Sequence, residues 1–250
     1  MAERARLGCP YPYGAESEYS TGRLMKLGVL FSGGKDSSFA CWRAMQHEEV
    51  ACLISVLSRN EESYMFHTPN IRWVPLQAEA AGLPLVQGET EGREESELED
   101  LRQVIRLAMD LHGIEGVVTG ALQSVYQASR IQRICADLDL WCFNPLWHAE
   151  PYRYLKGLLG AGFRVVVAGV FSSPFDASWL GREMDGQVLR DLEGIAHTHR
   201  ITLTGEGGEY ETFVLDAPFF RKRIAIQEAQ KEYWNHRGTY RITRAVLEAK

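Results

Sequence analysis

The feature that most constrains this chain is a short apolar run that leads into a glycine-rich loop. Residues 27–31 are followed directly by Ser32-Gly33-Gly34-Lys35-Asp36-Ser37, and a helical pattern begins at residue 36. Glycines let a backbone approach an anion closely, a helix N-terminus presents free N–H groups, and Lys35 adds a positive charge. The sequence therefore predicts a phosphate cradle at the end of a buried strand. The alternative is an ordinary glycine turn, which would not need a lysine.

The loop differs from a Walker motif, in which Ser or Thr follows the lysine, because Lys35 is followed by Asp36. It is similar instead to the pyrophosphate loop of the ATP pyrophosphatases, enzymes that split ATP into AMP and pyrophosphate. The resemblance implies that ATP binds at this loop.

Apolar strand patterns alternate with amphipathic helix patterns along most of the chain. We expect strands at 26–31, 50–57, 84–87, 116–119, 141–143 and 164–170. We expect helices at 36–47, 75–81, 94–112, 123–138, 151–161 and 186–196. This alternation favours an α/β fold with a doubly wound, mainly parallel sheet. Shorter strand-like runs at 212–215, 222–226 and 239–247 indicate a smaller C-terminal α/β part.

The pattern of apolar and polar residues changes along the chain, and this change suggests how the chain is divided into domains. Residues 1–24 lack periodicity and are predicted to form a flexible tail. We expect an ATP-binding domain over 25–125 and a substrate-recognition domain over 126–250.

Composition narrows the class of protein. The net charge of −6 argues against a broad nucleic-acid surface, and no apolar run approaches the ~20 residues that a membrane span needs. The five cysteines are scattered without a Cys-x-x-Cys pair, which favours reduced thiols over disulfides or zinc. We therefore expect a cytoplasmic protein with no membrane association and no stable nucleic-acid partner.

A second glycine follows the strand predicted at 116–119. In a doubly wound sheet, ligands bind at the carboxyl ends of strands where the winding direction changes. Gly120 is therefore a candidate nucleotide contact, with a plain turn as the alternative. Ser55 closes the second strand and is a candidate contact for adenine. Arg130, on the following helix, either faces an anion or pairs on the surface with a carboxylate.

Two loops carry unusual polar side chains. The segment 64–70 combines aromatic residues with His67, a candidate proton carrier, and Asn70, a candidate donor to a carboxylate. Its alternative role is to pack against the core. The segment 204–212 holds three glycines and three glutamates within seven residues, so its carboxylates are expected to converge on a positive group. The alternative there is an acidic surface hairpin.

Together, these segments resemble the diphthine–ammonia ligase family, in its compact archaeal type. The residues that carry the likeness are 32–37, 61–70, 118–121, Tyr126-Gln127 with Arg130, 145–147, 178–182 and 205–212. The last of these segments is the most specific. Ser172-Ser173-Pro174 departs from the usual pattern. The resemblance covers about residues 25–250 and implies a sheet of the adenine nucleotide alpha hydrolase type.

The resemblance also implies a reaction. Members amidate diphthine, a modified histidine on translation elongation factor 2, using ATP and ammonia and releasing AMP and pyrophosphate through an acyl-adenylate. The implied ATP contacts are Ser32, Gly33, Gly34, Lys35, Asp36, Ser37, Ser55 and Gly120. Magnesium is an implied cofactor, with Asp36 as its candidate ligand or, alternatively, a helix cap.

The remaining roles are assigned on the same basis. Catalytic roles are expected for Lys35, Asp36, Arg130, Glu206 and Glu209. Substrate contacts are expected for His67, Asn70, Tyr126, Gln127, Tyr210 and Glu211. Because diphthine carries a trimethylammonium group, Glu206, Glu209 and Tyr210 are candidates for recognising it or for trapping ammonium.

Two other functions remain open at this point. One is an ATP pyrophosphatase that thiolates tRNA or makes lysidine, although the acidic charge disfavours it. The other is a non-catalytic ATP sensor. The sequence leaves homo-oligomer formation open.

Overall fold

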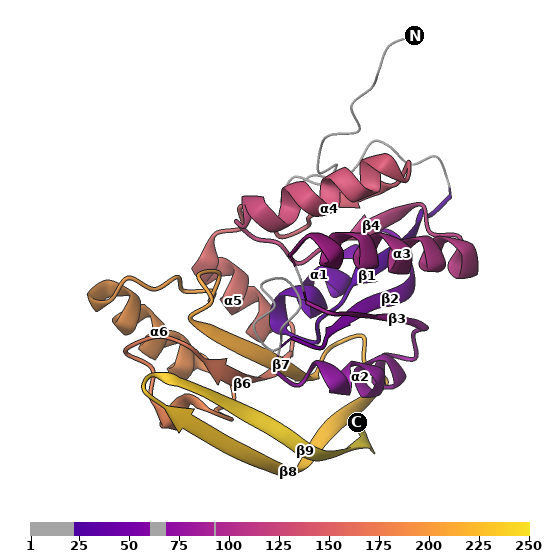
Figure 1. The fold of residues 1–250 in the computed structure, drawn as a ribbon. Coiled ribbons are helices and arrows are strands. Elements are labelled where there is room, and N and C mark those ends of the chain that lie inside the picture. The colour runs from indigo at the N-terminus through magenta and orange to yellow at the C-terminus, as the bar shows by residue number, and fades with distance from the viewer. Residues whose placement is uncertain (1–22, 61–68, 93) are drawn as a thin grey trace.

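The chain folds around two β-sheets that lie side by side (Figure 1). The computed structural model describes residues 23–60, 69–92 and 94–250. No helix in these ranges is both long enough and apolar enough to cross a membrane. The cysteines at positions 41, 52, 135 and 142 carry free thiols.

The first sheet is parallel and contains five strands. They are β1 (Lys26–Leu30), β2 (Glu49–Ser58), β3 (Leu85–Thr90), β4 (Gly116–Val118) and β5 (Trp141–Phe143), in the order β3-β2-β1-β4-β5. The chain winds outward in one direction from β1 to β3 and in the other from β4 to β5. The point where the winding reverses therefore lies between β1 and β4, which is where a doubly wound sheet binds its ligands.

Helices cover both faces of this sheet. They are α1 (Lys35–Met45), α2 (Val74–Ala81), α3 (Glu94–His112), α4 (Val125–Asp137) and α5 (Pro151–Gly160). Buried side chains of α3 and α4 pack on one face with Ile54 and Val117. Those of α1, α2 and α5 pack on the other face with Leu27 and Val29. The inner strands β1, β2 and β4 are mostly buried, which explains why they read as apolar runs.

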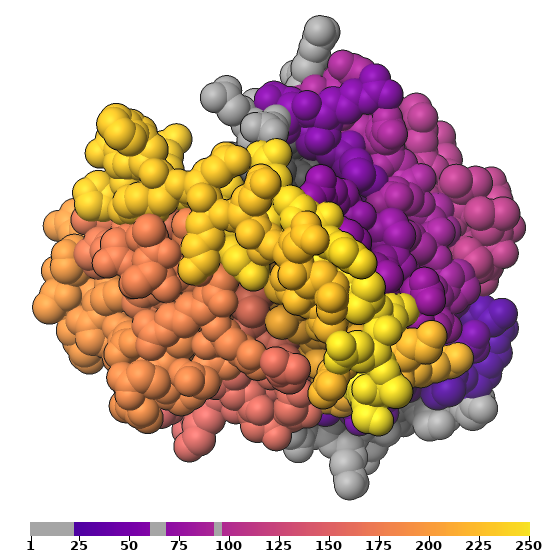
Figure 2. Space-filling model, turned by 90° about the horizontal axis from the view of Figure 1, so that it is seen from below, coloured from indigo at the N-terminus to yellow at the C-terminus, as the bar shows by residue number. Residues whose placement is uncertain are grey.

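The second sheet is antiparallel and shares a core with the α1 side of the first. Its strands are β6 (Arg164–Val170), β7 (Tyr210–Asp216), β8 (Lys222–Trp234) and β9 (Arg237–Ala249), in the order β7-β6-β9-β8. The helix α6 (Gly186–Thr198) precedes β7. The C-terminal strands, yellow in Figure 2, lie between the orange part of the chain and the purple part that belongs to the first sheet and its helices.

The predicted fold class is confirmed, but the C-terminal hairpin is longer than expected. Its two strands have 13 residues each, against the predicted runs at 222–226 and 239–247. The prediction stopped early because the outer parts of both strands are exposed and carry charged residues. Asn235 and His236 form a two-residue turn with φ values of 46° and 61°, as a tight hairpin with right-handed twist requires.

The change of sheet lies between β5 and β6, within residues 144–163. The division at 125/126 into an ATP-binding and a substrate-recognition unit stays a prediction.

Candidate active site

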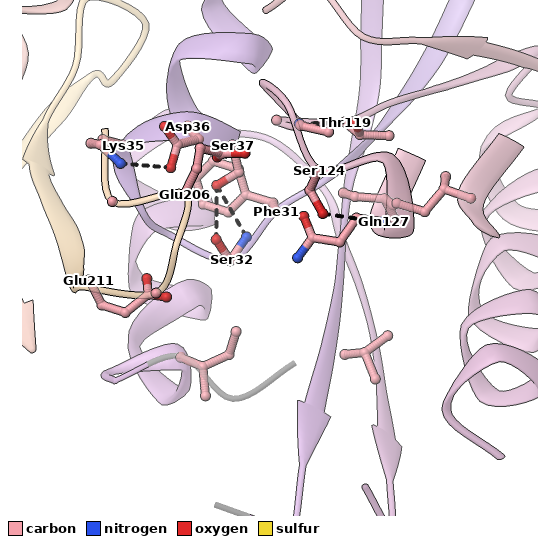
Figure 3. Close-up of a pocket in the computed structure, with 18 of the residues that line it drawn as sticks. Phe31, Ser32, Lys35, Asp36, Ser37, Thr119, Ser124, Gln127, Glu206 and Glu211 are labelled. Atoms are coloured by element: carbon pink, nitrogen blue, oxygen red, sulfur yellow. Dashed lines mark hydrogen bonds and ion pairs between the residues drawn. The ribbon is translucent and has the colours of Figure 1, made fainter. Parts of the chain in front are cut away.

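A cavity of about 350 Å³ opens at the carboxyl ends of β1, β2 and β4. It therefore lies at the point where the winding of the first sheet reverses. Its lining combines the glycine loop, the start of α4 and the acidic segment before β7 (Figure 3). The predicted site residues that line it are Ser32, Lys35, Asp36, Ser37, Gly120, Gln127, Glu206, Tyr210 and Glu211.

The glycine loop turns tightly between β1 and α1. Gly33 has a φ of +80°, in the left-handed region that favours glycine. The backbone N–H of Ser32 donates to Oγ of Ser37 at 3.2 Å, which closes the loop across the first turn of α1. A Cβ added to Gly120 would lie only 2.7 Å from the backbone nitrogen of Ser37. Gly120 is thus required for β4 to approach the loop, and it also lines the cavity.

Lys35 is the buried cation of the site, with a side chain only 4% exposed. Its Nζ donates to Oδ2 of Asp36 at 2.9 Å and lies 5.3 Å from the ring centroid of Tyr210. Burial alone would lower the pKa of Lys35, but Asp36, with Tyr210 and Glu211, raises it above its ordinary value. The ammonium therefore keeps its charge at the wall of the cavity.

The second sheet holds this loop from outside. The backbone N–H of Lys35 donates to Oγ1 of Thr212 at 3.1 Å, and Val214 N donates to the Gly33 carbonyl at 3.0 Å. The Gln77 amide on α2 donates to the carbonyls of both Gly33 and Val214 at 2.9 and 2.8 Å. The strand β7 is therefore hydrogen-bonded to the glycine loop, although about 180 residues separate them in sequence.

Two carboxylates enter the cavity from the acidic segment. Oε2 of Glu206 accepts from the backbone N–H of Gln123 at 3.2 Å, just before α4. Burial raises the pKa of Glu206, and the charge of Asp36 adds to the rise. Burial also raises the pKa of Glu211 to about 7; Lys35 opposes the rise, while Asp36 and Glu206 add to it. The cavity thus concentrates negative charge that a bound cation would relieve.

Glu209 has a different place from its two neighbours. Its carboxylate accepts from the backbone N–H of Thr202 at 2.5 Å and from the Thr202 hydroxyl at 2.9 Å. The Tyr210 hydroxyl donates to the Leu203 carbonyl at 2.9 Å. These bonds close the loop 202–210 on itself. Glu209 therefore stabilises the fold of the acidic segment without lining the cavity, whereas Tyr210 does line it.

Several predicted site residues lie outside the cavity lining. Asn70 donates to the Tyr240 carbonyl and accepts from Ile242 N, both at 2.8 Å, so its amide joins the chain to β9. The guanidinium of Arg130 stacks on the ring of Tyr126, with its carbon 3.4 Å from the centroid.

The remaining predicted residues fall behind the lining or beyond the described chain. Ser55 is 2% exposed, and its hydroxyl has no hydrogen-bond partner among the described residues. Gly33 and Gly34 belong to the glycine loop but are not among the residues that line the cavity. His67 lies outside the described residues.

Sequence reasoning missed three residues that support the site. Gln77 and Thr212 fix the glycine loop, and Tyr154 on α5 donates its hydroxyl to Oδ1 of Asp36 at 2.7 Å. Only Tyr154 left a signal in the sequence, because a tyrosine on the apolar stripe of a helix needs a partner for its hydroxyl. The contacts of Gln77 and Thr212 depend on how the two sheets meet, which no local pattern encodes.

The donor set of the cavity suits a magnesium ion only together with bound phosphate oxygens. Among the described residues, no three acidic, histidine or cysteine side chains are placed to hold a metal between them. Both oxygens of Asp36 already accept hydrogen bonds, from Lys35 and Tyr154. One or two carboxylates combined with substrate phosphates is nevertheless a usual way for proteins to bind magnesium.

Two family models match most of the chain. The one described as "Diphthamide synthase N-terminal domain" matches residues 25–141, and the one described as "Diphthamide synthase C-terminal domain" matches residues 150–247. The chain belongs to the diphthamide synthase family. In this family member both matched segments line the cavity: the first supplies the glycine loop and the start of α4, and the second supplies Glu206 and Glu211.

Similar proteins carry a matching name. A "Diphthine--ammonia ligase" of Homo sapiens is 31% identical over 229 residues, covering 82% of this chain and 84% of that protein. One of Danio rerio is 32% identical, covering 82% and 88%. One of Schizosaccharomyces pombe is 31% identical, but the match covers only 37% of that longer protein.

A solved structure also aligns with this diphthamide synthase family member. It is described as a predicted subunit of tRNA methyltransferase from Methanocaldococcus jannaschii, and it aligns with a TM-score of 0.41 at 16% identity. The alignment covers 78% of this chain and 98% of that one.

Proposed function

We propose that this protein is a diphthine–ammonia ligase. It would use ATP and ammonia to convert the carboxylate of diphthine on elongation factor 2 into the amide of diphthamide, releasing AMP and pyrophosphate. The observation that carries the proposal is the pairing of two opposite chemistries across one cavity: a buried lysine beside a glycine loop, and two carboxylates facing it. The names of relatives at about 30% identity support the same reaction.

The glycine loop supplies the groups that suit a pyrophosphate. The first turn of α1 presents backbone N–H groups, and Lys35 supplies a charge that its surroundings keep protonated. Ser32 and Ser37 place hydroxyl groups beside them. If magnesium binds, Asp36 would hold it together with phosphate oxygens, and the ion would supply further charge neutralisation. These groups would stabilise the negative charge that grows on pyrophosphate as it leaves.

The apolar part of the lining suits a purine base. It is formed by Ile54 and Val56 of β2, Ile71 just before α2, Leu101 of α3 and Ile131 of α4. Such a surface, next to a few convergent polar groups, is typical of small-molecule sites. We infer that the adenosine end of ATP lies there and that the triphosphate extends toward Lys35.

The proposed chemistry has two steps. In the first, a carboxylate oxygen of diphthine attacks the α-phosphorus of ATP, and the bond to the bridging oxygen of pyrophosphate breaks. In the second, the ammonia nitrogen attacks the acyl carbon, AMP leaves, and the nitrogen loses a proton. A carboxylate is a poor acyl donor, so forming the acyl-adenylate divides one difficult displacement into two easier ones.

The two carboxylates of the acidic segment are placed to serve the second step. An ammonium ion or the trimethylammonium of diphthine would be attracted by Glu206 and Glu211. With a pKa of about 7, Glu211 is suited to accept a proton near neutral pH. We therefore infer that Glu206 binds the cation and that Glu211 is the base.

Product analysis tests this proposal. The protein is incubated with labelled ATP, ammonium chloride and elongation factor 2 carrying diphthine, and the nucleotide products are separated. We expect equal amounts of AMP, pyrophosphate and amidated factor, with amidation depending on ammonium. Formation of ADP would contradict the proposal, AMP formed only with tRNA would favour a tRNA-modifying enzyme, and ATP binding without turnover would favour a sensor.

A further inference from the structure

The Tyr154 side chain is a buried titratable group next to the cavity. It lies on α5, is 1% exposed, and donates its hydroxyl to Oδ1 of Asp36 at 2.7 Å. The other oxygen of the same carboxylate, Oδ2, accepts from Nζ of Lys35 at 2.9 Å. Tyr154, Asp36 and Lys35 thus form a chain of two hydrogen bonds that ends at the cavity wall.

The position of this hydroxyl is fixed by packing. The Tyr154 ring lies against Phe39 of α1, with centroids 5.4 Å apart and the planes tilted by 56°. The start of α5 is fixed by Glu150, whose carboxylate accepts from the backbone N–H groups of Tyr152 and Arg153 at 2.9 and 2.8 Å. Neither the ring nor the helix can shift without disturbing the core, so the hydroxyl is a rigid donor.

We propose that Tyr154 is a positioning residue that orients the Asp36 carboxylate, which in turn holds the Lys35 ammonium at the cavity wall. This role rests on the proposed function, because it assumes that Lys35 acts on the leaving pyrophosphate. Asp36 is 30% exposed on its side chain and faces the cavity, and among the described residues its other hydrogen-bond partner is Lys35. A second fixed donor restricts the rotation of the carboxylate.

The consequence should appear in turnover more than in ATP binding. In the proposed function several groups of the loop share the binding of the triphosphate in the ground state, so a displaced ammonium would weaken that binding little. The charge on the leaving group grows in the transition state, where a preorganised donor matters most. Tyr154, which acts on this donor through Asp36, should therefore lower kcat when it is removed and leave KM for ATP nearly unchanged.

The test is Tyr154→Phe, which removes one oxygen and keeps the ring that packs on Phe39. The matched control is Tyr152→Phe, which makes the same change at an exposed site on the same helix. Both variants are assayed for AMP formation with elongation factor 2 carrying diphthine. For Tyr154→Phe we expect kcat to fall about tenfold, less than the loss for a direct donor, with KM for ATP within about twofold of wild type. The control should match wild type in both.

A double-mutant cycle shows whether Tyr154 acts through Asp36. In an Asp36→Asn background the charge that holds Lys35 is gone, so adding Tyr154→Phe should change kcat less than about twofold. A full tenfold loss in that background, or a Tyr154→Phe variant with wild-type kcat, would overturn the role. So would a variant that changes KM alone or loses activity only in proportion to its lower melting temperature. If wild type itself forms no AMP, the proposed function fails instead.

Discussion

The two loops that meet in the cavity are built in opposite ways. The glycine loop at 32–37 is closed by bonds between near neighbours, such as Ser32 to Ser37, and it presents N–H groups and an ammonium. The acidic segment at 205–211 presents carboxylates, and its shape depends on Glu209 bonding back to Thr202. One loop suits an anion and the other suits a cation. The loop at 32–37 is therefore the donor half of the site, and the segment at 205–211 is its acceptor half.

The two halves are nevertheless joined. Thr212 directly follows the acidic segment and accepts the hydrogen bond from the backbone N–H of Lys35. A change in either loop can therefore reach the other through β7. Substitutions that remove one charge at a time should separate what each half contributes.

The largest effect is expected from removing the cation of the donor half. Lys35→Met keeps the apolar stem but removes the ammonium, so AMP formation should fall about 10²–10³-fold, the range seen when one electrostatic donor to a transition state is lost. Lys156→Met, at an exposed site on α5, is the control and should keep wild-type turnover. Steady-state rates of pyrophosphate release measure both. Unchanged turnover in Lys35→Met would show that the glycine loop does not hold the leaving group.

A smaller and more selective effect is expected in the acceptor half. Glu206→Gln keeps an oxygen that can accept from Gln123 N but removes the charge. We expect amidation to fall about tenfold while the dissociation constant for ATP stays within about twofold. Isothermal titration with ATP and an amidation assay measure the two quantities, with Glu79→Gln on α2 as an exposed control. Equal loss of ATP binding would place Glu206 in the nucleotide site.

The free energy of unfolding should depend on pH because Glu211 is buried close to Asp36 and Glu206. Because the pKa of Glu211 rises from 4.5 to about 7, the native state binds more protons than the unfolded state between these values, and stability falls as pH rises through this window. Glu211→Gln imitates the protonated form and should raise the free energy of unfolding at pH 8 by on the order of 1–2 kcal/mol, with no gain near pH 4.

Urea unfolding of the ligand-free protein at several pH values measures this gain. Glu232→Gln, an exposed change on β8, serves as the control and should show no such trend. A gain that is equal at pH 4 and pH 8 would mean that the charge of Glu211 is not what costs stability.

The smallest functional effect is expected at Asn70, which stands outside both halves. Asn70→Asp tolerates the φ of 69° and keeps the acceptor for Ile242 N, but it sets a carboxylate oxygen against the Tyr240 carbonyl. We expect a loss of about 1–3 kcal/mol in the free energy of unfolding and turnover within twofold of wild type. Thermal unfolding and the AMP assay measure the two. A large rise in KM for the protein substrate would instead show that Asn70 contacts the substrate, as the sequence predicted.

How far the sequence predicted the molecule depends on whether a feature is local in sequence or joins distant segments. The strand, glycine loop and helix at 26–45 could be read because their signals are neighbours in sequence, and the helix at 94–112 matches its prediction in both bounds. The three carboxylates of the acidic segment were expected to converge, and the structure brings Glu206 and Glu211 to the cavity, whereas Glu209 bonds to Thr202 instead. The contacts of Gln77 and Thr212 could not be predicted, because each joins segments that meet only when the sheets pack. The sequence indicates that the Tyr154 hydroxyl needs a partner, but not that the partner is Asp36.

The measurement that tests the central claim most directly is a structure of the protein with a non-hydrolysable ATP analogue. The account predicts that the β- and γ-phosphates lie at the first turn of α1, on the backbone N–H groups of Asp36 and Ser37 and beside Nζ of Lys35, with the α-phosphate facing Glu206 and Glu211. A nucleotide bound elsewhere, or one with its α-phosphate turned away from the acidic segment, would contradict it.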